Sequence, residues 1–394
     1  MSHSTVRLGD VCDFVNGGAW NQSDYADAGY PVVQVSNIKK EGFDLAGQKF
    51  LNSEKFNQYK RHQIRSGDLI IATVGSHPSL PSAAGRAAVA NDAIAGMLLN
   101  QNAVLMRSCS PELYQSFLCR IGQSRLFQDY VQNAGKGAAN QIRIGIGAIK
   151  AFEVEIPPLQ TQERIAGILS AYDDLIENNR RRIALLEQAA RLLYREWFVH
   201  FRFPGSETTK FVDGLPEGWK RRPISEIWDI SYGKNLPKTK ITETGTYPVH
   251  GADGIIGFFE KENVSESMCL VTCRGNGSGN VRRTFGPTFV TNNCFVFRPK
   301  HKADGIRFHF AMNACETLRM QDMRTGAAQP QLTLAGISHV NSIVPEDDTL
   351  QSYNEIADPI WSEADNLRRQ NQKLANARDL LLPRLMDGRI PIPE

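Results

Sequence analysis

Hydrophobic residues follow two different spacings along the chain. In two regions they form short runs that end at glycine, such as Gly67–Gly75 and Ser267–Gly275, which is typical of buried strands that leave a sheet at a tight turn. After each region, from Pro158 and from Asp347, hydrophobic residues recur every three or four positions. The pattern predicts an α+β fold in which two mainly-β heads alternate with two long helices.

The second half of the chain repeats the order of the first. Tyr30-Pro-Val matches Tyr247-Pro-Val at an offset of 217, and Asn102–Arg107 matches Asn293–Arg298 at an offset of 191. The falling offset gives the first head about 25 additional residues between these points, and we expect them in the polar stretch from Ile38 to Gly67, because insertions cost little in loops. The heads are therefore expected to share a framework but not a surface.

Each long helix carries a hydrophobic stripe close to the 3.5-residue repeat of a coiled coil. We expect the two stripes to pack on each other as an antiparallel coiled coil with pseudo-twofold symmetry; the alternative is that each stripe packs on its own head. Asn179 and Asn371 lie in the stripes and would help to fix the register. The stripe residues are Ile165, Ile168, Tyr172, Leu175, Ile183, Leu186, Ala190, Leu193 and Trp197 in the first helix, and Tyr353, Ile356, Ile360, Ala364, Leu367, Leu374, Leu381 and Leu385 in the second.

These patterns divide the chain into five segments. We expect a head over residues 1–157, a spacer helix over 158–202, a linker rich in Pro, Gly and polar residues over 203–218, a second head over 219–346 and a second spacer helix over 347–394. At about 1.5 Å per residue, each helix would span on the order of 55 Å.

Composition limits the class of protein without naming its function. The chain has 394 residues, enough for about two to three domains, and its net charge of +3 permits a nucleic-acid partner without requiring one. No run of 18 apolar residues indicates a membrane span, and Met1–Ser4 lacks the features of an export signal. The seven cysteines form no Cys-x-x-Cys pair and are expected to be reduced, as in a cytoplasmic protein.

No catalytic motif is recognisable. Gly135-Lys-Gly137 lacks the spacing of a phosphate-binding Walker loop, and the histidines show no metal-ligand spacing. Gly275-Asn-Gly-Ser-Gly279 could be a dinucleotide or methyl-donor loop, but the residues that follow, Asn280–Arg283, resemble a strand rather than the helix that such a loop needs. A tight turn is the favoured interpretation.

If the heads bind DNA, lysine and arginine would contact phosphates, whereas arginine, asparagine, glutamine and serine would read base edges. For any single residue, ordinary solubilising charge is an equally good explanation, and the clusters Gly233–Lys240 and Arg274–Arg283 are the favoured sites. The candidate DNA-binding residues are Lys39, Lys40, Arg61, Ser76, His77, Arg86, Lys136, Gln141 and Arg143 in the first head, and Lys234, Lys238, Lys240, Arg274, Asn276, Ser278, Arg282, Arg283, Arg324 and Gln331 in the second.

The order of head, helix, head and helix resembles the specificity subunit of type I restriction-modification systems over nearly the whole chain. Val344–Asp347 departs from the pattern, since the second head enters its helix without a second proline or a Gln-Glu pair. The segments that carry the resemblance are Pro157–Ile165 with Leu169 and Asp173–Asp174, Trp197–Phe198, Asn371–Arg378, Leu381–Met386 with Gly388, and the turns Gly137–Gln141 and Gly326–Gln331 that close the heads.

The resemblance implies a protein without catalytic activity of its own. Each head, a target recognition domain, would read one half of a bipartite site in double-stranded DNA, and the helices would set the unread gap and dock two modification subunits. S-adenosylmethionine would bind to those subunits, which methylate adenine, and ATP with magnesium would serve restriction subunits in the full complex. This chain would then hold no cofactor or metal.

Two other functions are compatible with the residues. The chain could be a stand-alone DNA-modifying enzyme, a nuclease or methyltransferase with an unrecognised site. It could also be an interaction adaptor that does not bind DNA. Methyl transfer by the isolated chain would support the first of these alternatives, and salt-dependent, site-selective DNA binding by the assembled complex would exclude the second.

Overall fold

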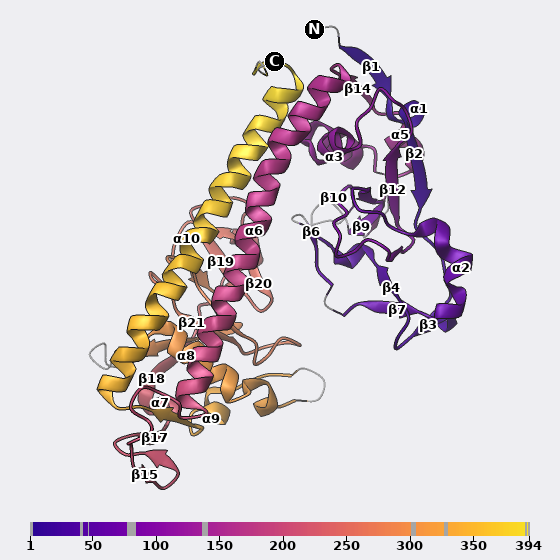
Figure 1. Cartoon of the computed structure of the whole chain (residues 1–394). Helices are drawn as coiled ribbons and strands as arrows, with labels where there is room; N and C mark the ends of the chain where they lie inside the picture. The colour runs from indigo at the N-terminus through magenta and orange to yellow at the C-terminus, as the bar shows by residue number, and fades with distance from the viewer. Residues whose placement is uncertain are drawn as a thin grey trace. The chain divides into compact units, whose positions relative to one another are not determined.

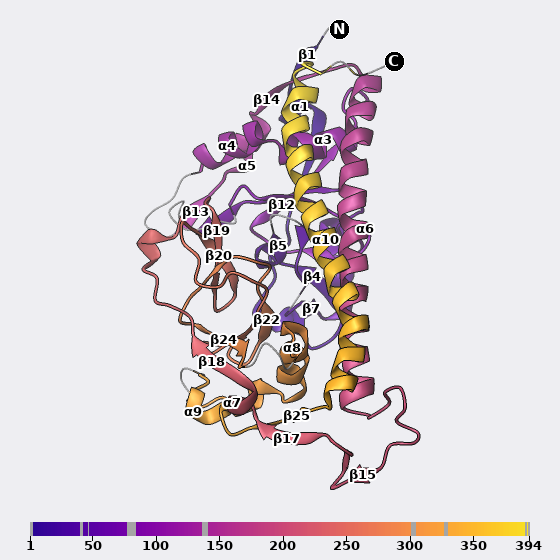
Figure 2. The same cartoon turned by 90° about the vertical axis from the view of Figure 1, so that its left-hand side faces the viewer.

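Two compact units, each holding one head together with parts of both long helices, make up the fold (Figures 1 and 2). The computed structural model describes residues 3–39, 42–45, 47–76, 84–135, 141–300, 305–326, 330–390 and 392. Unit 1 comprises residues 1–176 and 372–394, and unit 2 comprises residues 177–371. The long helices are α6 (Leu159–Phe198) and α10 (Asp347–Met386), and each contributes to both units.

The first head is built from short strands with a few small helices. Its strands are β1 (Ser4–Arg7), β2 (Cys12–Asn16), β3 (Tyr25–Ala26), β4 (Tyr30–Val33), β5 (Ile38–Lys39), β6 (Gly42–Phe43), β7 (Lys49–Leu51), β8 (Leu69–Ala72), β9 (Val74–Ser76), β10 (Ala87–Val89), β11 (Leu98–Leu99), β12 (Ala103–Ser108), β13 (Gln141–Arg143) and β14 (Glu153–Ile156). Its α-helices are α1 (Leu8–Val11), α2 (Phe56–Tyr59), α3 (Gln115–Gln123), α4 (Arg125–Asn133) and α5 (Ile146–Lys150).

The second head has the same character. Its strands are β17 (Lys220–Pro223), β18 (Trp228–Tyr232), β19 (Tyr247–Gly251), β20 (Gly254–Phe259), β21 (Cys269–Thr272), β22 (Val281–Arg283), β23 (Phe289–Val290), β24 (Cys294–Pro299) and β25 (Asn341–Val344). Its α-helices are α7 (Ile224–Ile227), α8 (Phe308–Thr317) and α9 (Leu334–Ile337). A small hairpin, β15 (Phe211–Val212) and β16 (Leu215–Pro216), precedes it in the predicted linker.

Both heads use one strand order in their main antiparallel sheet. The order is β10-β8-β12-β2 in the first head and β22-β21-β24-β18 in the second. The runs read as buried strands, Leu69–Ala72 and Cys269–Thr272, are fully buried in these sheets. A second sheet in each head contains one parallel pair, β4 with β11 and β19 with β23, which confirms the sequence match of Tyr30–Val32 with Tyr247–Val249.

Equivalent residues of the two heads form the same backbone hydrogen bonds. The amide of Thr73 donates to Asn102 O at 2.7 Å, and that of Cys273 donates to Asn293 O at 2.8 Å. The amides of Gly17 and Gly233 likewise donate to Ala103 O and Cys294 O. The shared framework predicted from sequence is therefore present in hydrogen-bonded register.

The additional residues of the first head are only partly where the sequence suggested. The offset is 217 at β4 and β19, 200 at β8 and β21, and 191 at β12 and β24, so 17 residues are added before β8 and 9 after it. The second group was not expected. It includes the segment from Thr73 to Gly85, which lies between β8 and β10 and whose counterpart between β21 and β22 runs from Cys273 to Gly279.

In both units α6 and α10 lie side by side and run in opposite directions (Figures 1 and 2). In unit 1, Ile165 and Leu169 of α6 share a core with Leu382 and Leu385 of α10. In unit 2, Ala190 and Trp197 share a core with Ala357 and Trp361. Both cores also contain head residues, so each stripe packs on the opposite helix and on a head, and the two predicted arrangements coexist.

The stripes are displaced by one residue at some positions. Ile168, Leu175 and Ile356 are exposed, whereas their neighbours Leu169, Ile176 and Ala357 are buried. Consecutive residues are about 100° apart on a helix, and where two neighbours are both hydrophobic the spacing alone does not decide which one faces inward. The predicted stripes are wrong at these three positions.

Candidate nucleic-acid interface

Each head is closed by a short backbone pairing beside its central strand. In the first head β13 pairs with β9, with Gln141 opposite Ser76, Ile142 opposite Gly75 and Arg143 opposite Val74. In the second head Gln331 forms a bridge with Arg274. We call these two pairings the closing pairs. In each head the closing pair includes residues that come shortly after the buried strand, β8 or β21.

In the second head the closing pair holds the glycine-rich loop tightly. The amide of Gly275 donates to Pro330 O at 3.0 Å, and the Ser278 hydroxyl lies within hydrogen-bond distance of Gly275 O and Pro330 O, at 2.7 and 2.9 Å. Ser278 is fully buried, so its predicted contact with DNA is wrong and its hydroxyl instead shapes the loop. The loop leads into strand β22, as the sequence indicated, and not into a helix that would bind phosphate.

Around this loop several predicted residues extend into solvent. Arg324 is also held in place, because its Nε donates to Gln321 O at 2.7 Å. Gln321 in turn donates to Asn280 at 2.9 Å, so the segment before the closing turn is tied to the loop. The exposed candidates of the second head are Lys234, Lys238, Lys240, Arg274, Asn276, Arg324 and Gln331.

Arg282 and Arg283 have different environments although they are adjacent. Arg282 is half-buried, and its Nη1 has no hydrogen-bond partner among the described residues. It lies near His250, whose pKa falls to about 4 because the ring is buried and because the Arg282 charge opposes protonation. Arg282 Nη1 is itself buried, so this unpaired donor does not face an external acceptor, and a contact of Arg282 with DNA stays a prediction that depends on the exposed part of the half-buried side chain.

Arg283 is part of the interior. Its side chain is 3% exposed, pairs with Asp365 of α10, and stacks against Phe285, Phe308 and Trp361. The predicted DNA contact of Arg283 is wrong, because a guanidinium enclosed by three aromatic rings and a carboxylate cannot reach phosphate. Strand alternation explains the difference, since consecutive residues of β22 point to opposite faces.

Fewer of the predicted DNA-binding residues have exposed side chains among the described residues of the first head. Lys39 is exposed and pairs with Asp44, Arg61 is exposed and its Nε donates to His62 Nε2 at 3.0 Å, and Arg143 is exposed. Arg86 is half-buried, and its Nη1 donates to Ile38 O at 2.7 Å, so it supports the neighbouring loop.

Five further candidates of the first head cannot be placed as side chains. Lys40, His77 and Lys136 lie outside the described residues, and only the backbone is described for Ser76 and Gln141. Ser76 and Gln141 are opposite each other in the closing pair. Their contact with DNA stays a prediction.

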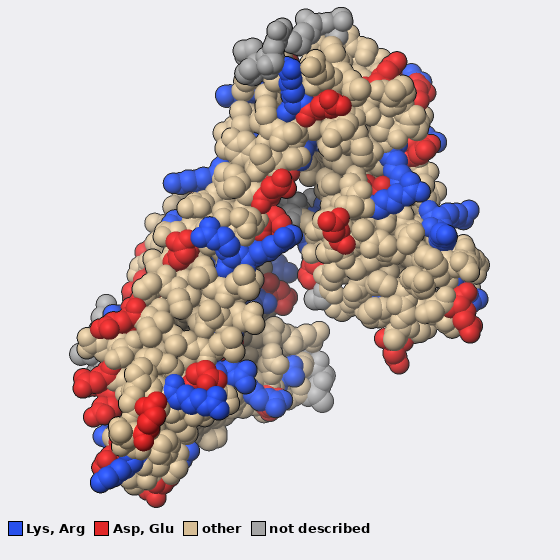
Figure 3. Space-filling view, viewed as in Figure 1, with Lys and Arg blue, Asp and Glu red and all other residues tan. Residues whose placement is uncertain are grey.

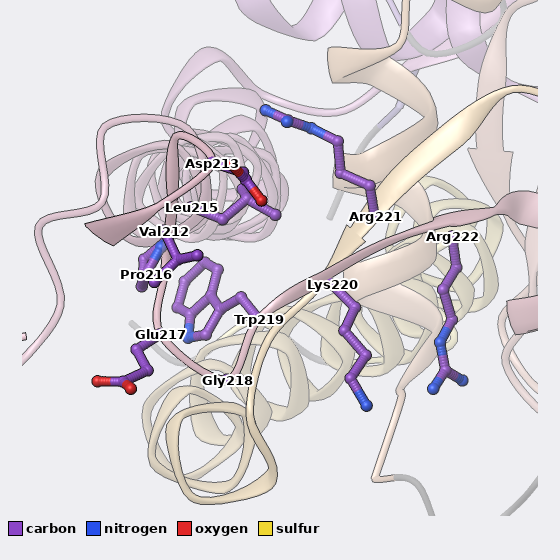
Figure 4. A pocket seen from close by; sticks show the side chains of 10 residues that line it. All are labelled: Val212, Asp213, Leu215, Pro216, Glu217, Gly218, Trp219, Lys220, Arg221 and Arg222. Atoms are coloured by element: carbon purple, nitrogen blue, oxygen red, sulfur yellow. The ribbon is translucent and has the colours of Figure 1, made fainter. Parts of the chain in front are cut away.

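Sequence reasoning overlooked one basic segment. Lys220, Arg221 and Arg222 of β17 are exposed and line an open hollow with the β15–β16 hairpin (Figure 4). Lys220 and Arg222 extend to one side of the strand and Arg221 to the other (Figure 4). The three consecutive basic residues were the available signal.

Charge is otherwise mixed, and Lys, Arg, Asp and Glu side chains are interspersed over the face drawn in Figure 3. Within the described part of the chain, no group of three or more His, Cys, Asp or Glu side chains could hold a metal ion. None of the described helices is long and apolar enough to cross a membrane. All seven cysteines are free thiols.

A family model and two known proteins are similar to this chain in sequence. A family model described as "Type I restriction modification DNA specificity domain" matches residues 3–188 and 216–374. The MjaIX specificity subunit of Methanocaldococcus jannaschii is 23% identical over 71% of this chain and 69% of its own length. The HindI specificity subunit of Haemophilus influenzae is 20% identical over 99% of this chain and 98% of its own length.

A solved structure shares the fold. The type I restriction-modification S subunit of M. genitalium superposes with a TM-score of 0.55 at 17% identity, over 98% of this chain and 96% of the other. The two matches of the family model, residues 3–188 and 216–374, each cover most of one head and part of the long helix that follows it.

Proposed function

The chain belongs to the type I restriction-modification DNA specificity family, and from this membership we propose that it reads a bipartite site in double-stranded DNA. Each head contacts one half-site through the exposed polar residues near its closing pair. The two half-sites differ in sequence because the two heads carry different residues at those places.

One observation carries this proposal: the heads share a hydrogen-bonded framework but differ in the loops that it holds. The segment from Thr73 to Gly85, which lies between β8 and β10 in the first head, has 13 residues, and its counterpart from Cys273 to Gly279, between β21 and β22 in the second, has 7. Loops on a rigid scaffold are where recognition residues concentrate. A repeated frame with unlike loops suits a reader of an asymmetric site.

We further propose that α6 and α10 act as a spacer. Each helix has 40 residues, or about 60 Å at 1.5 Å per residue. One turn of B-DNA measures about 34 Å, so a helix pair of this length suffices to separate two readers by more than one turn. The gap between the half-sites would then be left unread.

The partners follow from family membership and remain part of the proposal. Two modification subunits would dock on the helix pair, bind S-adenosylmethionine and methylate adenine, and restriction subunits would bring ATP and magnesium in the full complex. This chain would supply specificity without catalysis, and it would act in the cytoplasm, where DNA and free thiols coexist.

Methylation mapping tests the proposal. The complex reconstituted with its modification subunits is incubated with DNA of random sequence and S-adenosylmethionine, and methylated adenines are located on both strands. We expect one split motif with a gap of fixed length. Methyl transfer by this chain alone would favour the stand-alone enzyme, and a complex that shows no salt-dependent, site-selective binding to DNA would favour the adaptor.

A further inference from the structure

Arg143 and Gln331 occupy the same position in the two heads. The amide of Ile144 donates to Thr73 O at 2.8 Å, and the amide of Leu332 donates to Cys273 O at 2.9 Å. One residue earlier, Arg143 is opposite Val74 and Gln331 is opposite Arg274. Because Thr73 and Cys273 are themselves equivalent by their bonds to Asn102 and Asn293, the match holds residue by residue.

Both side chains are available for an external contact. Arg143 and Gln331 are exposed, whereas the residues that follow them, Ile144 and Leu332, are buried. In each head, alternation of side chains along the closing pair therefore turns this position outward. Gln331 uses its backbone N–H and C=O in bonds with Thr325, which fixes the direction of its side chain.

The position shared by Arg143 and Gln331 has different surroundings in the two heads, as we expect for a recognition residue. It pairs with the start of a segment that has 13 residues in the first head, from Thr73 to Gly85, and 7 in the second, from Cys273 to Gly279. The strands that support it have the same register in both. A common backbone thus presents two different side chains, both of which end in a planar group that can form two hydrogen bonds with one base.

We propose that this is a base-reading position, at which Arg143 selects guanine in one half-site and Gln331 selects adenine in the other. Arginine donates two hydrogen bonds to O6 and N7 of guanine in the major groove, whereas glutamine accepts from N6 and donates to N7 of adenine. The inference rests on the proposed DNA-reading function and adds the identity of two residues and their preferred bases.

The test exchanges the two side chains in the complex with its modification subunits. Arg143→Gln and Gln331→Arg are compared with the unchanged protein on DNA libraries that are randomised across both half-sites, with methylated adenine as the readout. We expect Arg143→Gln to reduce the preference for guanine at one position of one half-site by about tenfold and to raise adenine there. Gln331→Arg should have the converse effect in the other half-site.

Two controls separate base reading from other roles. Arg125→Gln makes the same chemical change at an exposed site on α4, where the side chain of Arg125 is 93% exposed, and should leave both half-sites unchanged. Arg143→Lys keeps the charge but loses the forked pair of donors, and should also relax the guanine preference.

The inference is overturned if Arg143→Gln weakens methylation of all sequences equally and Arg143→Lys restores it, since that is the behaviour of a phosphate contact. It is also overturned if both exchanges alter the same half-site or neither alters any preference. A different failure, in which the unchanged complex recognises no split motif, would refute the proposed function itself.

Discussion

Asn179 of α6 donates its Nδ2 hydrogen to Oδ1 of Asn371 of α10 at 2.9 Å, which joins the two long helices in unit 2 through a polar pair. Asn179 is 6% exposed and Asn371 is half-buried. A buried amide that loses its partner pays a desolvation cost, so this pair favours one alignment of the helices over a displaced one.

Replacement of one member should therefore cost more than replacement of both. Asn179→Leu is expected to lower the free energy of unfolding by about 1–3 kcal/mol, because Asn371 is left without this partner. Asn179→Leu with Asn371→Leu should recover most of that loss. Urea unfolding of the single and double variants measures the coupling, and additive effects would contradict a role in alignment.

Replacement of Arg282 and replacement of Arg283 should affect different properties of the protein. Arg282→Ala is expected to weaken DNA binding by the assembled complex with little change in stability, because Arg282 is only half-buried and points to the face of β22 opposite the enclosed Arg283. DNA affinity at moderate salt, measured together with the melting temperature, checks this.

Arg283→Ala is expected to do the opposite and destabilise the protein, by up to about 3 kcal/mol, because it opens a buried ion pair. Asp365 retains Arg368 at 3.1 Å, which keeps the loss at the lower end for such pairs. A variant that folds as well as the unchanged protein but binds DNA weakly would return Arg283 to the interface.

Arg282 and Arg283 show which features of the structure could be predicted from the sequence and which could not. The run Val281–Arg283 identified the strand and the heptad-like stripes identified the helices, because both depend on local periodicity. Whether an arginine meets solvent or a carboxylate 82 positions later depends on packing between distant segments. The same limit explains the burial of Ser278 and the displacement of Ile168 and Leu175 from the predicted stripe.

Acid should weaken the second head through His250. Burial and the nearby Arg282 charge lower the pKa of this ring to about 4, whereas an unfolded histidine titrates near 6.5. The folded state thus favours the neutral ring, and its contribution is complete above about pH 6.5 and is lost as the pH falls toward 4. At pH 5 the loss is expected to be about 2 kcal/mol relative to pH 7.

His250→Val provides the matched variant, because Val33 occupies the equivalent position in the first head. Urea unfolding at pH 7 and pH 5 should show a smaller acid loss for this variant than for the unchanged protein. Equal losses in the two proteins would exclude His250 as the source.

Gly17 and Gly233 should tolerate no side chain. A Cβ at Gly17 would lie 1.8 Å from Asn100 O, and one at Gly233 would lie 2.3 Å from Thr291 O, both backbone atoms that cannot move away alone. Gly17→Ala and Gly233→Ala are each expected to cost at least about 2 kcal/mol. Gly147→Ala is the control, since its Cβ would meet nothing within 4 Å in helix α5. Thermal melts compare the three, and similar melting temperatures would contradict the close backbone approach.

The spacer role can be tested by lengthening both helices together. The variant carries seven residues inserted between Ile176 and Glu177 and seven between Asn371 and Gln372. Both insertions lie between the Asn179–Asn371 pair and the Asp173–Arg378 ion pair, whose atoms are 2.6 Å apart. A whole heptad in each helix keeps both pairs in register. It lengthens the helices by about 10 Å, or about three base pairs of B-DNA. Methylation mapping should show a longer gap between unchanged half-sites, whereas altered half-site sequences with the original gap would refute the helices as a spacer.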